Sequence, residues 1–328
     1  MKDLFCFIVY LFAVPFMAIV GLFSHPFLVK AGRFFGRVMN VFPCFGGLCR
    51  ENVHAAFPEK SEEEVREIAR KSLEHLLITV LEFFWIRKHP EKLEKMIDCS
   101  RAEETALLGL EKMKEGQGTI LITPHLGNWE FAGRGLAQLY GYRMATVVRS
   151  IRNPYLDKLI SDSRSSCGNV EIIYSEGGAR AMNSALNNGK TLGILIDQNV
   201  KLRHGGIFVN MFGLPVPISR APATLGRMKN RFIAVGACLR QEDGSYRAFL
   251  RSLPKEAIDY ESDQALIQTL TDMSEELIRM APEQYLWMYK RFQYIPDGTP
   301  EEALKRFPSY AKKASVHFYS RCPIRHKR

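Results

Sequence analysis

The 328-residue chain has none of the cysteine or histidine patterns that build disulfide frameworks and metal sites. Its seven cysteines are odd in number and scattered, and no Cys-x-x-Cys pair occurs among them. Such a pattern indicates a reducing compartment and argues against a structural zinc site. The eight histidines are dispersed and His-Glu-x-x-His is missing, so the sequence predicts no metal site.

Several nucleotide-binding and hydrolase signatures are also missing. Gly189-Lys190-Thr191 matches the end of a phosphate-binding loop, but the glycine required earlier in that loop falls at Ser184. Gly133-Arg-Gly135 has Gln138 where a dinucleotide fingerprint needs its third glycine. No Gly-x-Ser-x-Gly elbow is present, which argues against an α/β-hydrolase.

Acidic residues are too few to balance the basic ones, and the formal net charge is +10. A charge of this sign favours an anionic partner: a membrane surface, a nucleic acid or an acidic carrier protein. No DNA- or RNA-binding motif accompanies the charge, so we expect no nucleic acid partner.

What the chain does have is a long uncharged run at residues 4–23, which is long enough to cross a hydrocarbon core. A signal peptide is the alternative, but Asp3 offsets the basic Lys2 at its start and no Ala-x-Ala cleavage site follows. Pro15 leaves open a kinked or shallow helix. Basic residues follow the run and place the rest of the chain in the cytoplasm by the positive-inside rule. We therefore expect a membrane anchor at residues 1–25.

Residues 26–98 are predicted to form a helical, membrane-proximal region. Aromatic and basic residues mix over 26–57, which fits either an amphipathic segment on the bilayer or ordinary helix packing. Ser61-Glu-Glu-Glu64 is a capping box, and apolar residues at helical spacing predict a long core helix after it. Glu82 lies in the apolar half of that helix, and we expect it on a solvated flank rather than buried and functional.

From residue 99 to 300 the pattern alternates between helices and short β-branched strands. This alternation predicts an α/β domain with a mainly parallel central sheet flanked by helices. The expected strands are 119–124, 143–149, 170–174, 191–197, 207–212, 232–240 and 246–251, the last two forming an antiparallel hairpin. The expected helices are 101–114, 128–140, 154–166, 177–188, 219–230 and 262–280.

The final segment, residues 301–328, is a basic tail with eight basic residues against two acidic ones. It could contact anionic membrane lipid, which favours each basic residue near the surface by about 1 kcal/mol. It could equally be a solvated terminus.

The clearest candidate for chemistry is His125-Leu-Gly-Asn-Trp-Glu130, where a buried strand turns into a helix. A carboxylate on one imidazole nitrogen fixes the tautomer and stabilises the imidazolium that forms when the other nitrogen takes a proton. We predict that Glu130 supplies this carboxylate and that Asn128 begins the helix. From spacing alone, a core histidine beside a surface glutamate is an equally good interpretation. Trp129 is expected in the core.

This motif resembles the His-x₄-Asp/Glu motif of glycerolipid acyltransferases, and more closely that of the bacterial lipid A late acyltransferases (lauroyl/myristoyl acyltransferases). Four further blocks resemble that family in the same order along the chain. They are Glu51-Asn-Val-His-Ala-Ala-Phe-Pro-Glu59, Val148-Arg-Ser-Ile-Arg-Asn-Pro154, Asp197-Gln198 with Gly206-Ile-Phe-Val-Asn-Met-Phe-Gly213, and Pro282-Glu-Gln-Tyr-Leu-Trp-Met-Tyr-Lys-Arg-Phe292. Tyr285, Met211 and Ser150 depart from the family pattern and leave the exact acceptor open.

The resemblance implies an enzyme of the bacterial inner membrane with its catalytic domain on the cytoplasmic face. It would transfer a fatty acyl group from acyl carrier protein to a hydroxyl of a lipid A precursor, with the carrier thioester as substrate and no cofactor. The general base would be His125, oriented by Glu130.

Their places in the sequence suggest roles for the other candidates. Arg149, at the end of a predicted strand, would meet a phosphate or the oxyanion, or form an ordinary ion pair. Arg164 is an anion-binding candidate or a solvated side chain. Asp197 ends an apolar strand and would hold Arg149, bind the sugar headgroup with Gln198, or cap the strand structurally.

Two other functions remain open from the sequence. The first is acyl transfer to another membrane glycolipid, such as a phosphatidylinositol mannoside. The second, of a different class, is a non-catalytic, membrane-anchored protein that binds anionic lipid. Lys290 and Arg291 fit an anionic substrate or a solvated face equally well. The acyl chain length and the hydroxyl that is acylated do not follow from the sequence.

Overall fold

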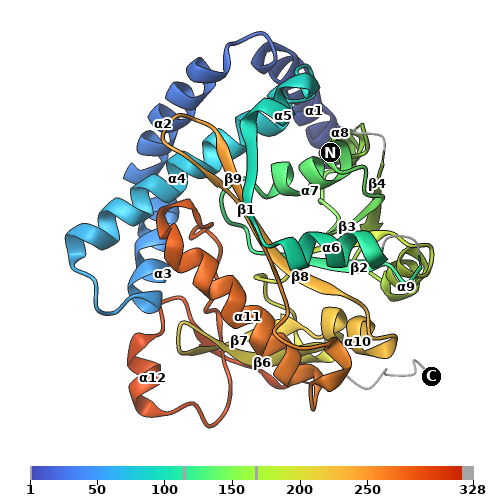
Figure 1. Cartoon of the computed structure of the whole chain (residues 1–328). Helices are drawn as coiled ribbons and strands as arrows, with labels where there is room; N and C mark the ends of the chain where they lie inside the picture. The colour runs from blue at the N-terminus through green and yellow to red at the C-terminus, as the bar shows by residue number, and fades with distance from the viewer. Residues whose placement is uncertain (1, 114–115, 167–168, 320–328) are drawn as a thin grey trace, which may run out of the picture.

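A seven-stranded sheet forms the centre of the protein, with helices on both faces (Figure 1). The computed structural model describes residues 2–113, 116–166 and 169–319. The strand order is β1-β9-β8-β2-β5-β3-β4. Strands β2, β3, β4, β5 and β8 are parallel to one another, whereas β1 and β9 run in the opposite direction. The predicted α/β class with a mainly parallel sheet is therefore confirmed.

The strand bounds follow the β-branched runs closely. The strands of the main sheet are β1 (Ile97–Ala102), β2 (Thr119–Thr123), β3 (Met144–Val148), β4 (Val170–Tyr174), β5 (Thr191–Leu195), β8 (Ile233–Arg240) and β9 (Tyr246–Ser252). β8 and β9 form the predicted antiparallel hairpin. Two small sheets lie outside, an antiparallel pair of β6 (Gly206–Met211) with β7 (Leu214–Ser219) and a parallel pair of β10 (Tyr294–Ile295) with β11 (Lys312–Lys313).

The sequence pattern missed β1 and β7, besides the two-residue strands β10 and β11. β1 is an edge strand with a polar sequence, and the helix expected at 101–114 begins only at Glu104. β7 contains Pro215 and Pro217, which the sequence pattern does not read as strand because proline cannot donate to a ladder. Both lie where only one neighbouring strand is present, so their local sequence is under weaker β constraint.

The helices between residues 99 and 300 agree with the predicted ranges to within about three residues. They are α6 (Glu104–Met113), α7 (Trp129–Leu139), α8 (Pro154–Ser165), α9 (Ala179–Asn187), α10 (Ala221–Met228) and α11 (Asp263–Met280). Two short helices, α12 (Glu301–Arg306) and α13 (Val316–Tyr319), lie in the predicted basic tail. Arg306 donates to the carbonyls of Ala55 and Phe212, so this part of the tail packs on the protein, while residues 320–328 lie outside the described residues.

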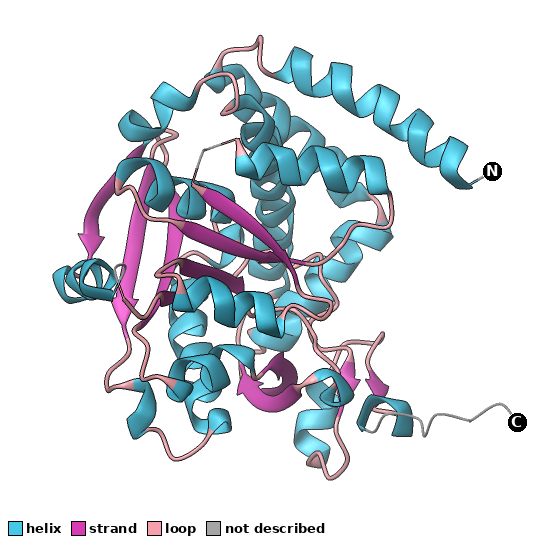
Figure 2. Cartoon of the chain, turned by 90° about the vertical axis from the view of Figure 1, so that its right-hand side faces the viewer, coloured by secondary structure: helices cyan, strands magenta, loops and turns pink. Residues whose placement is uncertain are grey.

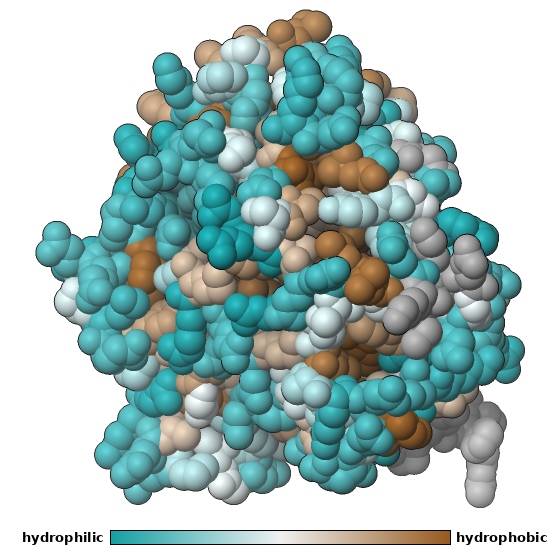
Figure 3. Space-filling model, viewed as in Figure 1, coloured by the Kyte–Doolittle hydropathy of each residue, from teal (hydrophilic) through white to brown (hydrophobic). Residues whose placement is uncertain are grey.

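The N-terminal region consists of α1 (Lys2–Val20), α2 (His25–Val41), α3 (Leu48–Ala56), α4 (Glu62–Trp85) and the single turn α5 (Leu93–Met96). α1 continues through Pro15, and it is long and apolar enough to cross a membrane. Only 11% of its apolar window is buried inside the protein. Figure 2 shows α1 as a separate rod at the edge of the molecule, and Figure 3 shows apolar surface at the top, over the N-terminal helices.

Helix α2 packs directly against α4 through two glycines. A Cβ atom at Gly36 would lie 2.5 Å from the Cα atom of Glu74, and one at Gly32 would lie 2.9 Å from the backbone nitrogen of Ile78. Only glycine permits this approach. The opposite face of α2 exposes Phe27, among other large apolar side chains. Packing of residues 26–57 on the protein is thus confirmed for α2, and contact of its exposed face with a bilayer stays a prediction.

The predicted solvated position of Glu82 is wrong. Its side chain is 0% exposed. α4 is covered by α2, by α3 and by the short helical turn Pro282–Gln284 that follows α11, so its charged residues do not all face water. Arg240, from the end of β8, forms an ion pair with Glu82.

Candidate active site

The turn between β2 and α7 carries His125 at the carboxyl edge of the parallel strands. Gly127 has a φ of +62°, and a Cβ atom there would lie 2.1 Å from the carbonyl oxygen of Cys238, so the turn requires glycine. The amide of Asn128 donates to the same Cys238 carbonyl at 2.8 Å. The amide of Leu286 donates to the carbonyl of His125 at 3.0 Å. The turn is therefore fixed between the hairpin and the segment near residue 285.

Asn128 caps α7 as predicted. Its side-chain oxygen accepts a hydrogen bond from the amide of Phe131 at 2.9 Å. A cap of this kind satisfies one of the free amides at a helix start and is worth about 1 kcal/mol. Its amide nitrogen donates to Glu82 at 3.0 Å, so both ends of the Asn128 side chain are engaged.

The carboxylate on the imidazole of His125 is that of Asp197. Nδ1 of His125 lies 2.7 Å from Oδ1 of Asp197, and the backbone amide of His125 donates to Oδ2 at 2.8 Å. Asp197 follows β5, which pairs directly with β2 in the sheet. Because the carboxyl ends of parallel strands meet at one edge, the two side chains are brought together from 72 positions apart in the sequence.

This pair has the electrostatics of an oriented base. Burial alone would raise the pKa of Asp197, but the charge and hydrogen bonds of His125 outweigh it and hold that pKa below its ordinary value. An ionised carboxylate only accepts, so Nδ1 carries a proton, and a neutral ring then has its lone pair on Nε2. His125 is 14% exposed at its side chain, which leaves the ring accessible from one side.

The predicted pairing of His125 with Glu130 is not formed, since no hydrogen bond or ion pair among the described residues joins them. Arg164, from α8, takes both oxygens of Glu130 at 2.5 and 3.0 Å. Burial would lower the pKa of Arg164, but the Glu130 carboxylate outweighs it and raises that pKa. Glu130 lies in the first turn of α7, five positions after His125, and faces α8 rather than the imidazole.

A cavity of about 1240 Å³ joins these groups. His125, Glu130 and Arg164 line it together with Arg149 and Gln198, so five of the seven predicted site residues face one space. Its inner wall is apolar and includes Leu121, Met144, Ile160, Met182 and Ile194. Arg149 is exposed.

Trp129 also lines this cavity and lies edge-on to the imidazole, with ring centroids 5.0 Å apart, so its predicted place in the core is wrong. It is half-buried, because α7 begins at the edge of the sheet and its first residue faces the opening.

The sequence interpretation missed the role of the segment that follows α11. Arg291 is 2% exposed and donates to Asn199 at 2.8 Å, two positions after Asp197. Asn199 in turn donates from its backbone amide to the hydroxyl of Tyr289 at 2.9 Å. Arg291 therefore faces neither solvent nor the cavity but supports the strand end that carries Asp197. The sequence marked this segment as the family-like block 282–292, but gave no sign of its contact with Asn199 beside the Asp197-Gln198 block.

The composition of the site gives no support for a metal ion. Over residues 2–113, 116–166 and 169–319, no group of three or more His, Cys, Asp or Glu side chains could hold one. The groups that line the cavity include two imidazoles, two carboxylates and several guanidinium groups.

The family model for bacterial lipid A biosynthesis acyltransferases matches residues 3–294. The chain belongs to this family. The lipid A biosynthesis lauroyltransferase of Escherichia coli K12 is 25% identical over 268 residues, which cover 77% of this chain and 80% of the relative. The lipid A biosynthesis palmitoleoyltransferase of the same organism is 25% identical over 263 residues, covering 76% and 79%.

A more distant similarity extends over a shorter part of the chain. A phosphatidylinositol mannoside acyltransferase of Mycobacterium tuberculosis H37Rv is 31% identical over 114 residues, or 34% of this chain and 35% of the relative. As a member of the lipid A acyltransferase family, the chain is an acyltransferase. The His125 turn and the cavity lie within the matched residues.

Proposed function

We propose that this protein transfers a fatty acyl group from acyl carrier protein to a hydroxyl of a lipid A precursor. The observation that carries the proposal is the His125–Asp197 pair, which opens onto a large, partly apolar cavity in a chain of this family. An imidazole with an oriented, unprotonated Nε2 suits the removal of a proton from an attacking hydroxyl. The reaction needs the two substrates and no cofactor.

The chemistry is a direct acyl transfer from the sulfur of the carrier thioester to the hydroxyl oxygen of the acceptor. His125 takes the proton of the acceptor hydroxyl while its oxygen attacks the thioester carbonyl, and the tetrahedral oxyanion forms. The C–S bond then breaks, the carrier thiolate takes the proton from His125, and the acyl ester remains on the acceptor. Asp197 holds the Nδ1 proton throughout and stabilises the imidazolium, a role that does not require it to become protonated.

The arginines of the cavity provide the positive charge that this reaction needs. Arg164 is held by both oxygens of Glu130, so its remaining donors are fixed in direction. Arg149 faces the same cavity from the end of β3. Donors directed at a developing oxyanion contribute about 2.7–4 kcal/mol each when well placed. We assign Arg164 and Arg149 to the oxyanion or to a phosphate of the acceptor, Glu130 to the placement of Arg164, and Gln198 to substrate binding.

We place the protein at the inner membrane, with the catalytic domain on the cytoplasmic face. The N-terminal helices support the membrane location, and the basic residues after the apolar run support the side through the positive-inside rule. α1 has the required length and apolarity, and α2 exposes aromatic side chains beside it. A lipid acceptor would then reach the cavity from the bilayer, while an acidic carrier protein and anionic lipid would meet the basic surface of a chain with net charge +10. In this arrangement the anchor in the membrane is residues 1–25. The helical region 26–98 connects the anchor to the acyltransferase domain, residues 99–300.

A second candidate is acyl transfer to a phosphatidylinositol mannoside, which the similarity to the mycobacterial acyltransferase favours. It matches about a third of the chain, whereas the lipid A acyltransferases of E. coli match about three quarters. We therefore place the lipid A precursor first.

The test is acyl transfer by the purified full-length protein in detergent, with a set of acyl carrier protein thioesters and each of the two glycolipids. We expect the mass of the lipid A precursor to rise by one acyl group. Transfer only to the phosphatidylinositol mannoside would show that this glycolipid, and not the lipid A precursor, is the acceptor. Lipid binding without any transfer would contradict the proposal and favour a non-catalytic lipid-binding protein.

A further inference from the structure

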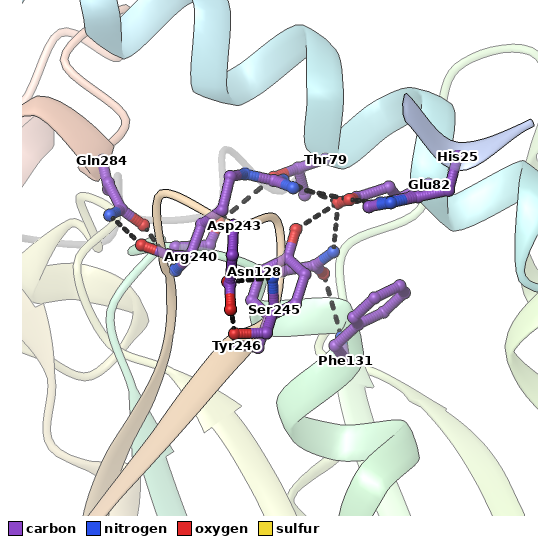
Figure 4. Close-up of polar contacts among 11 residues, drawn as sticks. His25, Thr79, Glu82, Asn128, Phe131, Arg240, Asp243, Ser245, Tyr246 and Gln284 are labelled. Atoms are coloured by element: carbon purple, nitrogen blue, oxygen red, sulfur yellow. Dashed lines mark hydrogen bonds and ion pairs between the residues drawn. The ribbon is translucent and has the colours of Figure 1, made fainter. Parts of the chain in front are cut away.

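Glu82 is the centre of a buried polar cluster next to the His125 turn (Figure 4). Arg240 donates to its two oxygens at 2.5 and 2.6 Å, and Asn128 donates at 3.0 Å. Nε2 of His25 lies 2.7 Å from Oε1, and the hydroxyl of Tyr246 donates to Oε2. The cluster joins α2, α4, α7 and the β8–β9 hairpin at a single carboxylate.

The carboxylate is ionised and can only accept. Burial alone would raise the pKa of Glu82, but the Arg240 guanidinium outweighs it and lowers that pKa to about 2. Every neighbour of Glu82 must therefore direct a donor toward it, including the imidazole of His25. A carboxylate with this many partners fixes the orientation of each of them.

The orientation of Asn128 follows from this constraint. Its amide nitrogen must face Glu82, so its oxygen faces the amide of Phe131 and caps α7. Thr79, also on α4, donates to the carbonyl of Gly127 at 3.1 Å. α4 thus holds two consecutive residues of the turn, and the first of these, Gly127, is two positions after His125.

The same carboxylate is bonded to the first residue of α2. His25 begins α2, whose Gly32 and Gly36 pack on α4. Its ring is 18% exposed and lies against Trp85, with ring centroids 5.2 Å apart. Phe27, two residues further on, is exposed on the apolar surface of the N-terminal helices.

We propose that His25 and Glu82 are positioning residues for acyl transfer, which couple the packing of α2 on α4 to the orientation of Asn128 and of the turn that carries His125. The inference rests on the proposed function only for its kinetic consequence. The link itself is carried by the unbroken series of contacts from His25 through Glu82 and Asn128 to Phe131. On this account, an α2 that is detached from α4 leaves His125 less well fixed.

His89 provides a matched control for His25. Its ring also lies against Trp85, with centroids 4.6 Å apart, and its Nε2 lies 3.0 Å from the carbonyl oxygen of Gly21. Both imidazoles therefore tie the N-terminal segment to the end of α4, and both line the same shallow depression of about 350 Å³. Of the two, His25 is the one bonded to Glu82.

The experiment compares His25→Phe and His89→Phe in the full-length protein in detergent. Hydrogen exchange of the peptide spanning residues 126–132, read by mass spectrometry, reports the Asn128 cap directly. We expect His25→Phe to speed exchange there about tenfold and to lower kcat about tenfold with KM unchanged. His89→Phe should leave both within about twofold of the wild type. His25→Gln retains an N–H donor and should restore most of kcat.

Equal exchange in the two phenylalanine variants would overturn the link. Faster exchange without loss of kcat in His25→Phe would overturn the positioning role. A thermal unfolding curve for each variant separates a local change from general unfolding, which would speed exchange in every peptide. Should the wild type transfer no acyl group at all, the proposed function fails, but the exchange comparison still decides whether His25 and Asn128 are coupled.

Discussion

Two imidazoles in this protein each lie 2.7 Å from a buried carboxylate, His125 beside Asp197 and His25 beside Glu82. The exposed fractions of the side chains are similar, 14% and 4% in the first pair and 18% and 0% in the second. The surroundings differ. Asp197 gives both oxygens to His125, one to the ring and one to the backbone amide, and the ring faces a cavity of about 1240 Å³.

Glu82 instead divides its oxygens among several donors, and Arg240 neutralises its charge. The imidazole of His25 is one of those donors, and it faces a depression of only about 350 Å³. The comparison shows that the distance between an imidazole and a carboxylate does not identify a catalytic base. What distinguishes the proposed base is a carboxylate that bonds that residue with both of its oxygens, together with space for a substrate beside the ring.

The largest effect that this comparison predicts is for His125→Ala. Loss of the base should lower kcat/KM for acyl transfer by about 10⁴-fold. The assay is acyl transfer from carrier thioester by the purified variant, with His25→Phe as the contrasting imidazole. Near wild-type turnover for His125→Ala would remove it from the chemistry.

The second-largest effect is expected for Asp197→Asn, which should lower kcat by about 10³-fold. Asparagine keeps the shape of the side chain but no longer stabilises the imidazolium or fixes the Nδ1 proton. The measurement is kcat over a range of pH for the variant and the wild type. The two pH profiles should differ, because the Asp197 carboxylate no longer stabilises the protonated imidazole. Unchanged kcat would mean that the contact is structural.

Glu82→Gln should act mainly on stability. It leaves Arg240 buried without a negative partner, and we expect the free energy of unfolding to fall by about 3 kcal/mol. Denaturant unfolding in detergent measures this change. The double variant Glu82→Gln with Arg240→Met removes both charges and should recover most of the loss; no recovery would mean that the charge balance is not the cause.

A smaller effect is expected from acid. The pKa of Glu82 is lowered from an ordinary value of 4.5 to about 2, so its contribution to stability is complete above about pH 4.5 and is lost as the pH falls toward 2. By pH 3 the loss from this one group is roughly 2 kcal/mol. Unfolding free energies at pH 6 and pH 3 should therefore differ less in Glu82→Gln than in the wild type. An identical difference in both would contradict the assignment.

Much of the fold could be predicted from the sequence because its strands are short, buried and β-branched. The fully buried β2 and β8 are examples, since burial on both faces leaves near-continuous apolar runs. Edge strands carry less of this signal, which is why the polar β1 and the proline-containing β7 were missed.

In the site, too, contacts between residues close in sequence could be predicted, whereas contacts between distant residues could not. The Asn128 cap depends on a residue three positions away and could be predicted. The partner of His125 depends on β2 lying beside β5, so spacing along the chain favoured Glu130 instead of Asp197. Glu82 looked like a solvated helix residue because its main partner, Arg240, is 158 positions away.

The central claim is that Asp197, and not Glu130, orients the base. The most direct measurement is kcat for acyl transfer by Asp197→Asn and Glu130→Gln, side by side and at one pH. Glu130→Gln keeps a carbonyl for Arg164 and leaves the His125–Asp197 contact intact, so we predict a loss of about tenfold, against about 10³-fold for Asp197→Asn. A larger loss in Glu130→Gln than in Asp197→Asn would contradict the account.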